Sequence, residues 1–170
     1  MAKIGLFYGS TTGHTEEVCT WLKDSLETAG FIVDMIRVKP DVLPLFEHYD
    51  RLILAASTWG YGDLQEDWEA IFDEFSRVNF VGKTVALVGL GDQVTFDAHF
   101  ADAIGILARC VRQRGGRLIG RWPTEGYSFS KSAAVDNGSF VGLVLDQDNE
   151  EHLTPDRIKD WVTQVLSELT

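Results

Sequence analysis

The side chains best suited to chemistry lie together near the start of the chain, in segment 9–15. Four hydroxyl side chains and two glycines make up most of this segment: Gly9, Ser10, Thr11, Thr12, Gly13 and Thr15. It follows an apolar stretch, Lys3–Tyr8, that predicts a buried strand, and it leads into a helical pattern, His14–Ala29, that ends at Gly30. A glycine-containing turn before a helix directs its backbone N–H groups and the positive end of the helix toward one point. The segment therefore predicts an anion site that suits a phosphate.

The residue types in this loop indicate which class of phosphate ligand it could bind. The loop contains no lysine, so it is neither the Gly-x-x-x-x-Gly-Lys-Ser/Thr loop of nucleoside triphosphatases nor a Gly-x-Gly-x-x-Gly dinucleotide fingerprint. Neutral donors and a helix dipole suit a terminal monophosphate better than a transferable polyphosphate. His14 adds positive charge only when it is protonated. Taken alone, the loop is equally compatible with a turn that its hydroxyl groups cap and that binds nothing.

The rest of the chain alternates predicted strands and helices. Strands are predicted over 31–38, 51–56, 83–89, 117–122 and 140–145, and helices over 65–76, 97–114 and 154–169, the last with Thr154 as its N-cap. This alternation is typical of the α/β class, with a parallel sheet and right-handed crossovers. Residues 123–139 interrupt the alternation, and their aromatic side chains indicate packing. Trp59 lies outside the amphipathic patterns, as either a lid on a ligand or a plug over the core.

The charge balance limits the partners. The chain of 170 residues predicts one domain, 1–170, with its own core. Its 15 basic and 26 acidic residues give a net charge of −11, which argues against nucleic acid and anionic membranes. Two acidic clusters lie at 63–74 and 146–151. This charge favours a basic protein partner, although an acidic surface also confers solubility.

No apolar run approaches the length of a membrane span, and the N-terminus lacks a signal-peptide pattern. We therefore expect no membrane insertion and a cytoplasmic protein, or one of the soluble plastid phase if a transit segment has been removed. The sequence shows no exposed apolar stripe, so we also expect a monomer. Cys19 and Cys110 match neither a metal-binding nor a Cys-x-x-Cys spacing, and are expected to be buried apolar residues.

Four motifs, in order along the chain, resemble those of flavodoxins. Ser10-Thr11-Thr12-Gly13-His14-Thr15 resembles the Thr/Ser-x-Thr-Gly-x-Thr phosphate loop of that family. The resemblance continues through the segments Ser57-Thr58-Trp59-Gly60, Gly89-Leu90-Gly91-Asp92-Gln93 and Gly142-Leu143-Val144-Leu145-Asp146. It implies a doubly wound, flavodoxin-like parallel sheet of five strands in the order 2-1-3-4-5, with FMN at the switch point between strands one and three. The interruption at 123–139 splits the fifth strand, as in long-chain flavodoxins.

The resemblance also assigns roles to individual residues. Ser10 to Thr15 would hold the FMN phosphate, and Trp59, after Thr58, would stack on one flavin face. Phe96 lies where many flavodoxins carry a tyrosine that covers the other face. The Gly60-Tyr61 peptide would meet flavin N5, and glycine tolerates the positive φ that this requires. The pyrimidine edge would contact Gly91, Asp92 and Gln93, and Asp146 would lie near the ribityl chain and the ring edge.

These roles imply a low-potential one-electron carrier. FMN would cycle between semiquinone and hydroquinone, and the acidic surface would dock basic redox proteins such as ferredoxin–NADP reductase, photosystem I or nitrogenase reductase. The alternative is an FMN-dependent NAD(P)H:quinone or nitro reductase. That reaction needs an open flavin face, and aromatic covers on both faces would exclude nicotinamide. A signalling receiver domain is disfavoured, because Tyr8-Gly9 and Ala56-Ser57 stand where it needs acidic residues.

Overall fold

A parallel sheet forms the centre of the computed structural model, which describes residues 2–169. Its main strands are β1 (Lys3–Tyr8), β2 (Ile32–Arg37), β3 (Arg51–Trp59), β5 (Thr84–Leu90) and β10 (Leu143–Leu145), in the order β10-β5-β3-β1-β2. A further strand, β6 (Arg117–Ile119), also pairs in parallel with β5. With β6 and β10 as the two pieces of the fifth strand, this is the predicted order 2-1-3-4-5, and the predicted fold class is confirmed.

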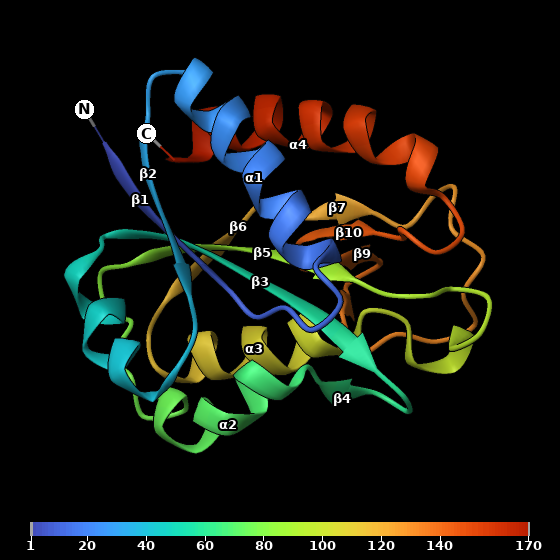
Figure 1. The fold of residues 1–170 in the computed structure, drawn as a ribbon, viewed down its shortest axis with the longest axis horizontal. Helices are drawn as coiled ribbons and strands as arrows, with labels where there is room; N and C mark the ends of the chain where they lie inside the picture. The colour runs from blue at the N-terminus through green and yellow to red at the C-terminus, as the bar shows by residue number, and fades with distance from the viewer. Residues whose placement is uncertain (1, 170) are drawn as a thin grey trace.

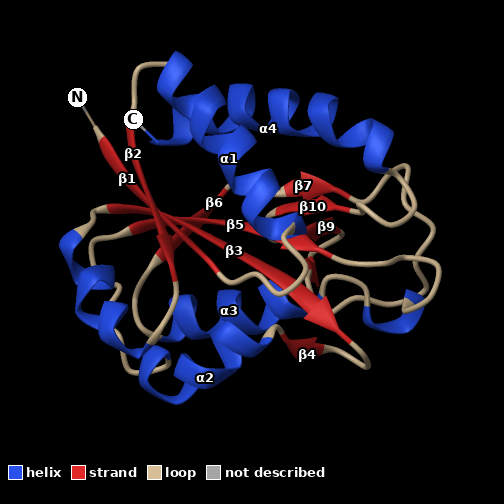
Figure 2. Ribbon diagram, viewed as in Figure 1, coloured by secondary structure: helices blue, strands red, loops and turns tan. Residues whose placement is uncertain are grey.

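Helices cover both faces of the sheet. Figures 1 and 2 show α1 (His14–Thr28) and α4 (Thr154–Leu169) on one face, and α2 (Glu66–Phe75) and α3 (Asp102–Gln113) on the other. Because side chains alternate along a strand, β3 sends Ile53 to the α1/α4 core and Leu54 to the α2/α3 core. Three short 3₁₀ segments complete the helical elements of the described chain: Pro40–His48, Asp97–His99 and Glu151–Leu153.

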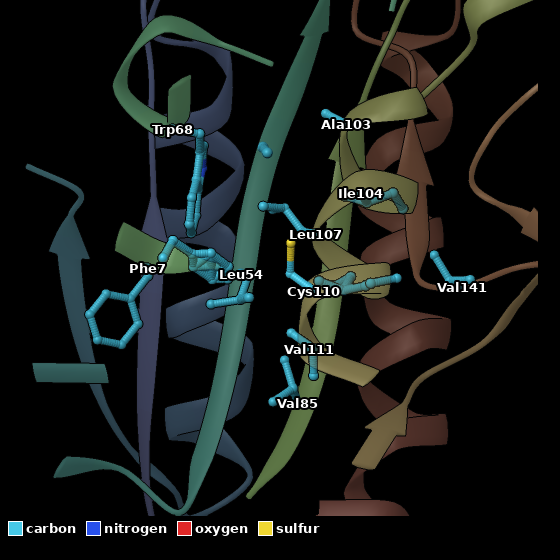
Figure 3. Close-up of a cluster of buried hydrophobic side chains, with 14 of the residues drawn as sticks. Phe7, Leu54, Trp68, Val85, Ala103, Ile104, Leu107, Cys110, Val111 and Val141 are labelled. Carbon is cyan, nitrogen blue, oxygen red and sulfur yellow. The ribbon is translucent and has the colours of Figure 1, made fainter. Parts of the chain in front are cut away.

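Figure 3 shows part of the core that lies between the sheet and helices α2 and α3. Trp68 of α2 is fully buried, and its indole N–H donates to the backbone oxygen of Ala55 at 2.9 Å. In α3, a Cβ on Gly105 would lie 2.2 Å from the backbone oxygen of Ala133, so glycine allows this helix to contact the 132–134 segment directly. The thiols of Cys19 and Cys110 are free and buried, as expected.

The segment that splits the fifth strand forms a small sheet of its own. Strands β7 (Trp122–Pro123), β9 (Ser139–Phe140) and β8 (Val135–Asp136) pair antiparallel in that order. Tyr127 and Phe129 pack against the α2/α3 core, which confirms the packing predicted for 123–139.

Continuous strands over 117–122 and 140–145 were wrong predictions, since each divides into two short pieces. The chain leaves the main sheet at Gly120, whose φ is +79°. It rejoins beside Gly142, where a Cβ would lie 2.2 Å from the backbone oxygen of Leu87. Both breaks depend on backbone conformations and close approaches that hydrophobic patterning does not report.

Three other features differ from the predictions by more than a one-residue shift of an element end. Strand β3 extends to Trp59, past the predicted end at 56, because β4 (Asp63–Leu64) pairs antiparallel with it. The predicted 97–114 helix is interrupted at Ala101, which has a left-handed φ of 57°. Thr154 was predicted as an N-cap but has helical dihedral angles, and its hydroxyl donates to the side-chain oxygen of Gln147. Within residues 2–169, no helix has the length and apolar character needed to cross a membrane.

The insertion should make stability depend on alkaline pH through Tyr127. Its hydroxyl donates to the Val144 backbone oxygen at 2.5 Å and accepts from the Trp122 indole N–H at 2.9 Å. Burial raises the pKa of Tyr127 to about 12, although Arg157 opposes the shift. An unfolded tyrosine ionises near pH ~10, so the unfolded state binds fewer protons above that pH and stability should fall as pH rises.

We expect the free energy of unfolding by urea to fall between pH 10 and 12, about the interval between the two pKa values. Tyr127→Phe should be less stable than the natural chain near neutral pH, because two hydrogen bonds are lost, but should show a shallower alkaline decrease. Tyr61→Phe is the matched control at an exposed position. Equal pH slopes for Tyr127→Phe and the natural chain would contradict this account.

Candidate cofactor-binding site

A pocket of about 350 Å³ opens at the carboxyl end of the sheet. Its walls come from the ends of β3 and β5 and from the loops that follow β1, β3, β5 and β10, which converge at the edge where doubly wound sheets bind ligands. The residues that line it are Thr11, Thr12, His14, Thr15, Ser57, Thr58, Trp59, Gly60, Leu90, Gly91, Asp92, Phe96, Gln147 and Asp148.

Most residues predicted for the site from the sequence lie in this lining. Those outside it are Ser10, Gly13, Tyr61, Gln93 and Asp146, each next to or bonded to a residue of the lining or its loops. The site assignments did not include Ser57, Leu90, Gln147 and Asp148. Ser57 and Leu90 fall within recognised motifs and Asp148 within an acidic cluster, whereas Gln147 carries no sequence signal beyond its position next to a motif residue.

One end of the pocket is rich in hydrogen-bond donors. Gly13 precedes α1 with a left-handed φ of 94° and open space around its Cβ position, and its N–H donates to Ser10 Oγ at 3.1 Å. The hydroxyl residues Thr11, Thr12 and Thr15 and the N-terminal turn of α1 face the pocket. Hydroxyl groups, backbone N–H groups and a helix N-terminus are donors, and a phosphate ester accepts from such groups.

The other end has aromatic walls. Trp59, at the end of β3, is 42% exposed, and its indole N–H donates to Ser57 Oγ at 3.0 Å. Phe96 lines the pocket from the loop after β5. Tyr61 lies outside the lining and is 83% exposed, with its ring edge-on to Phe96 at 6.4 Å between centroids. Large rings that stay accessible beside a cavity suit a flat aromatic ligand.

Strand β3 and helix α3 hold the middle of the pocket together. The Thr58 hydroxyl accepts from the backbone N–H of Ala103 at 2.8 Å, within the first turn of α3. This contact fixes the end of β3 directly before Trp59. A Cβ on Gly91 would lie 3.0 Å from the backbone nitrogen of Ala101, so glycine allows the loop after β5 to run close to α3.

Carboxylates border the pocket where the loops after β5 and β10 meet. Burial raises the pKa of Asp92, but hydrogen bonds from Thr95, Asn149 and Val94 outweigh it, so the pKa lies below its ordinary value. Burial and the neighbouring charges of Asp92 and Asp146 raise the pKa of Asp148, against an opposing effect of His14. Further negative charge at this end of the pocket would therefore be disfavoured.

Asp146 is fully buried behind this border and does not line the pocket. Its carboxylate accepts from the backbone N–H groups of Gln93, Asp148 and Asn149 at 3.0–3.1 Å. It also accepts from the side-chain amides of Gln93, at 2.8 Å, and Asn149, at 2.9 Å. Asp146 therefore joins the loop after β5 to the loop after β10.

The fold places the chain among the doubly wound α/β proteins, and its pocket has a hydroxyl-rich loop and a helix N-terminus on one side and aromatic side chains on the other. A protein-family model described as flavodoxin matches residues 6–161. A flavodoxin of Nostoc sp. is 47% identical over 166 residues, covering 98% of this chain and 96% of that protein. Flavodoxin 2 of Escherichia coli is 42% identical over 168 residues, with 98% and 96% covered. The chain belongs to the flavodoxin family.

Solved structures agree with this assignment. The crystal structure of Fusobacterium nucleatum flavodoxin bound to flavin mononucleotide superposes with a TM-score of 0.94 at 32% identity, and all of both chains is covered. Members of the family are electron-transfer flavoproteins rather than enzymes.

Proposed function

We propose that this chain is a low-potential one-electron carrier that uses non-covalently bound FMN and transfers electrons between redox proteins. FMN, when bound, supplies a centre that takes up electrons singly or in pairs. One observation carries the proposal: a single pocket has hydroxyl groups and a helix N-terminus at one end and two aromatic side chains at the other. That arrangement matches the phosphate and the ring system of FMN.

The residues present fit the cofactor. Thr11, Thr12 and Thr15 would bind the phosphate together with backbone N–H groups of the loop. Trp59 and Phe96 would cover the two faces of the ring. With both faces covered, a nicotinamide or quinone has no face on which to stack, which favours electron transfer through the ring edge over hydride transfer.

The acidic border supports a low potential. A carboxylate about 10 Å from a reduced, negatively charged flavin would disfavour that charge by roughly 1–2 kcal/mol at an effective dielectric constant of about 20. Asp92 and Asp148 both line the pocket, and the net charge of −11 adds a field of the same sign. The same charges favour a basic docking surface on the partner, such as ferredoxin–NADP reductase, photosystem I or nitrogenase reductase, with the carrier acting as a monomer.

Stepwise anaerobic reduction of the FMN-loaded protein tests this function. We expect a one-electron-reduced flavin with long-wavelength absorption to accumulate, a strongly negative second potential, and no oxidation of NADH or NADPH. Electron transfer to a basic redox protein should slow as salt is raised. Direct two-electron reduction by NADPH would instead establish the reductase alternative, and failure to retain FMN would contradict both.

A further inference from the structure

The predicted anion-binding loop, residues 9–15, is contacted on the side away from the pocket by Gln65, the residue that caps α2. Gln65 is fully buried, and its side-chain oxygen accepts from the backbone N–H of Asp67 at 3.1 Å. Only the oxygen of an amide side chain can accept that bond, so the orientation of the amide is fixed. Its NH₂ group is thereby directed at the loop, where it donates to Thr11 Oγ1 at 2.9 Å.

Asp67 and Arg37 hold the preceding residue of the loop. The Asp67 carboxylate accepts from the backbone N–H of Ser10 at 3.1 Å and from Arg37 Nε at 3.1 Å. The Arg37 guanidinium also donates to the backbone oxygen of Ser10. Both backbone groups of Ser10 are therefore occupied by side chains that do not line the pocket.

The loop also packs against the start of α2. A Cβ on Gly9 would lie 2.1 Å from the side-chain oxygen of Gln65 and 3.0 Å from Trp68 Cδ1. Since Trp68 is buried and bonded to β3, it anchors this helix end to the sheet. The position of the loop is thus set by α2, which is distant from it in sequence.

The bond from Gln65 also determines what the Thr11 hydroxyl can do. A hydroxyl has one proton to donate, and an amide donor already occupies an acceptor site on Thr11 Oγ1. The Thr11 proton therefore points away from Gln65, and it is donated to Glu66 Oε1 at 3.3 Å, in an exposed contact. That long, solvated bond can be exchanged for one to an anion in the pocket.

We propose that Gln65 is a positioning residue for the FMN phosphate, acting through Thr11 and not by contact with the ligand. It keeps the Thr11 proton directed away from Gln65 and available to an anion in the pocket, while Asp67 and Arg37 hold the loop backbone at Ser10. This inference rests on the proposed function and adds a second layer of residues, with Gln65 buried at its centre, behind the phosphate end of the site.

Binding of FMN and riboflavin, which differ only by the phosphate, tests the inference. In Gln65→Leu, the Kd for FMN should rise about ten- to a hundredfold, and the Kd for riboflavin should change less than about twofold. In Gln65→Glu, which keeps the size of the side chain, the carboxylate would accept the Thr11 proton, so FMN affinity should fall at least as far. Gln164→Leu is the matched control, because that amide bonds the backbone oxygen of Arg121 and does not line the pocket.

A double-mutant cycle tests the route through Thr11. In a Thr11→Val background, Gln65→Leu should cause little further loss of FMN affinity. Three results would overturn the proposal. The Gln65 variants could lose FMN and riboflavin affinity equally, both could keep an unchanged Kd for FMN, or the effect of Gln65→Leu could be fully additive with that of Thr11→Val. If the natural chain bound FMN and riboflavin with equal affinity, only the phosphate role of the loop would be refuted. If it bound neither flavin, the proposed function would be refuted as well.

Discussion

Replacing Trp59 by alanine is expected to weaken FMN binding by about ten- to a hundredfold, or roughly 1.4–2.7 kcal/mol. Trp59 lines the pocket and is 42% exposed, so its ring is available to a ligand without rearrangement of the core. Covering about 60–100 Å² of apolar surface at ~25 cal/mol/Å² supplies about 1.5–2.5 kcal/mol, and stacking geometry adds about 0.5–1.5 kcal/mol. Reorganisation of the exposed turn after β3 offsets part of this sum.

Titration of the protein with FMN, followed by flavin fluorescence, measures this effect. Trp59→Phe should retain most of the affinity, because a smaller ring still covers the flavin. Trp21→Ala is the matched control, since Trp21 is 36% exposed on α1 and does not line the pocket. The loss in Trp59→Ala should be similar for FMN and riboflavin, which separates it from the phosphate-specific effect expected at Gln65. A Kd unchanged by Trp59→Ala would mean that the ring binds elsewhere.

The sequence correctly predicted those parts of the fold that local patterns encode. Strand β1 and the start of α1 were predicted with their correct bounds, because an apolar run and a Gly-Ser-Thr-Thr-Gly turn report strand, loop and helix directly. The strand order came from resemblance to flavodoxins, and the alternation of strands and helices supported it. Local patterns were sufficient for the strand, the loop and the helix start because each of them lies within a short stretch of sequence.

The features that were missed depend on contacts between distant segments. Ala101, with its left-handed φ, interrupts a helical pattern that looks continuous in the sequence. Two residues later, the N–H of Ala103 donates to the Thr58 hydroxyl of β3, a contact between distant segments. The sequence predicts Gln65 only as the first residue of the 65–76 helix, and the fold is needed to show that its amide donates to Thr11. The lining residue Gln147 likewise has no local pattern that separates it from other polar loop residues.

Asp146 shows what a motif match can and cannot determine. The resemblance to flavodoxins assigns this residue to the site and implies a position near the ribityl chain and the ring edge. In the structure the carboxylate is fully buried and its hydrogen bonds run to Gln93, Asp148 and Asn149. A short motif identifies a loop, but it cannot distinguish a residue that contacts the ligand from one that shapes the loop.

Asp146→Ala is therefore expected to act mainly on stability. Hydrogen bonds to a charged group contribute about 1.5–3 kcal/mol each, and donors left buried without a partner add a penalty. Allowing for water that enters the space, we expect the free energy of unfolding to fall by about 3 kcal/mol. For a chain of this length, that corresponds to a decrease of about 6–12 °C in Tm. Thermal unfolding of the flavin-free protein measures it.

Asp148→Ala is the matched control, because it removes a carboxylate from the same loop with the opposite expected sign. Burial and the charges of Asp92 and Asp146 raise the pKa of Asp148, so its ionised form is less favourable in the folded state than in the unfolded state. This cost of ionising Asp148 in the folded state is fully present at pH 7 and is lost as pH falls through the raised pKa. At neutral pH, Asp148→Ala should therefore leave stability unchanged or slightly increase it. If Asp146→Ala were no more destabilising than Asp148→Ala, the buried carboxylate would not join the two loops. A loss of FMN affinity at Asp146 with unchanged Tm would then place its role at the ligand, as the motif alone implies.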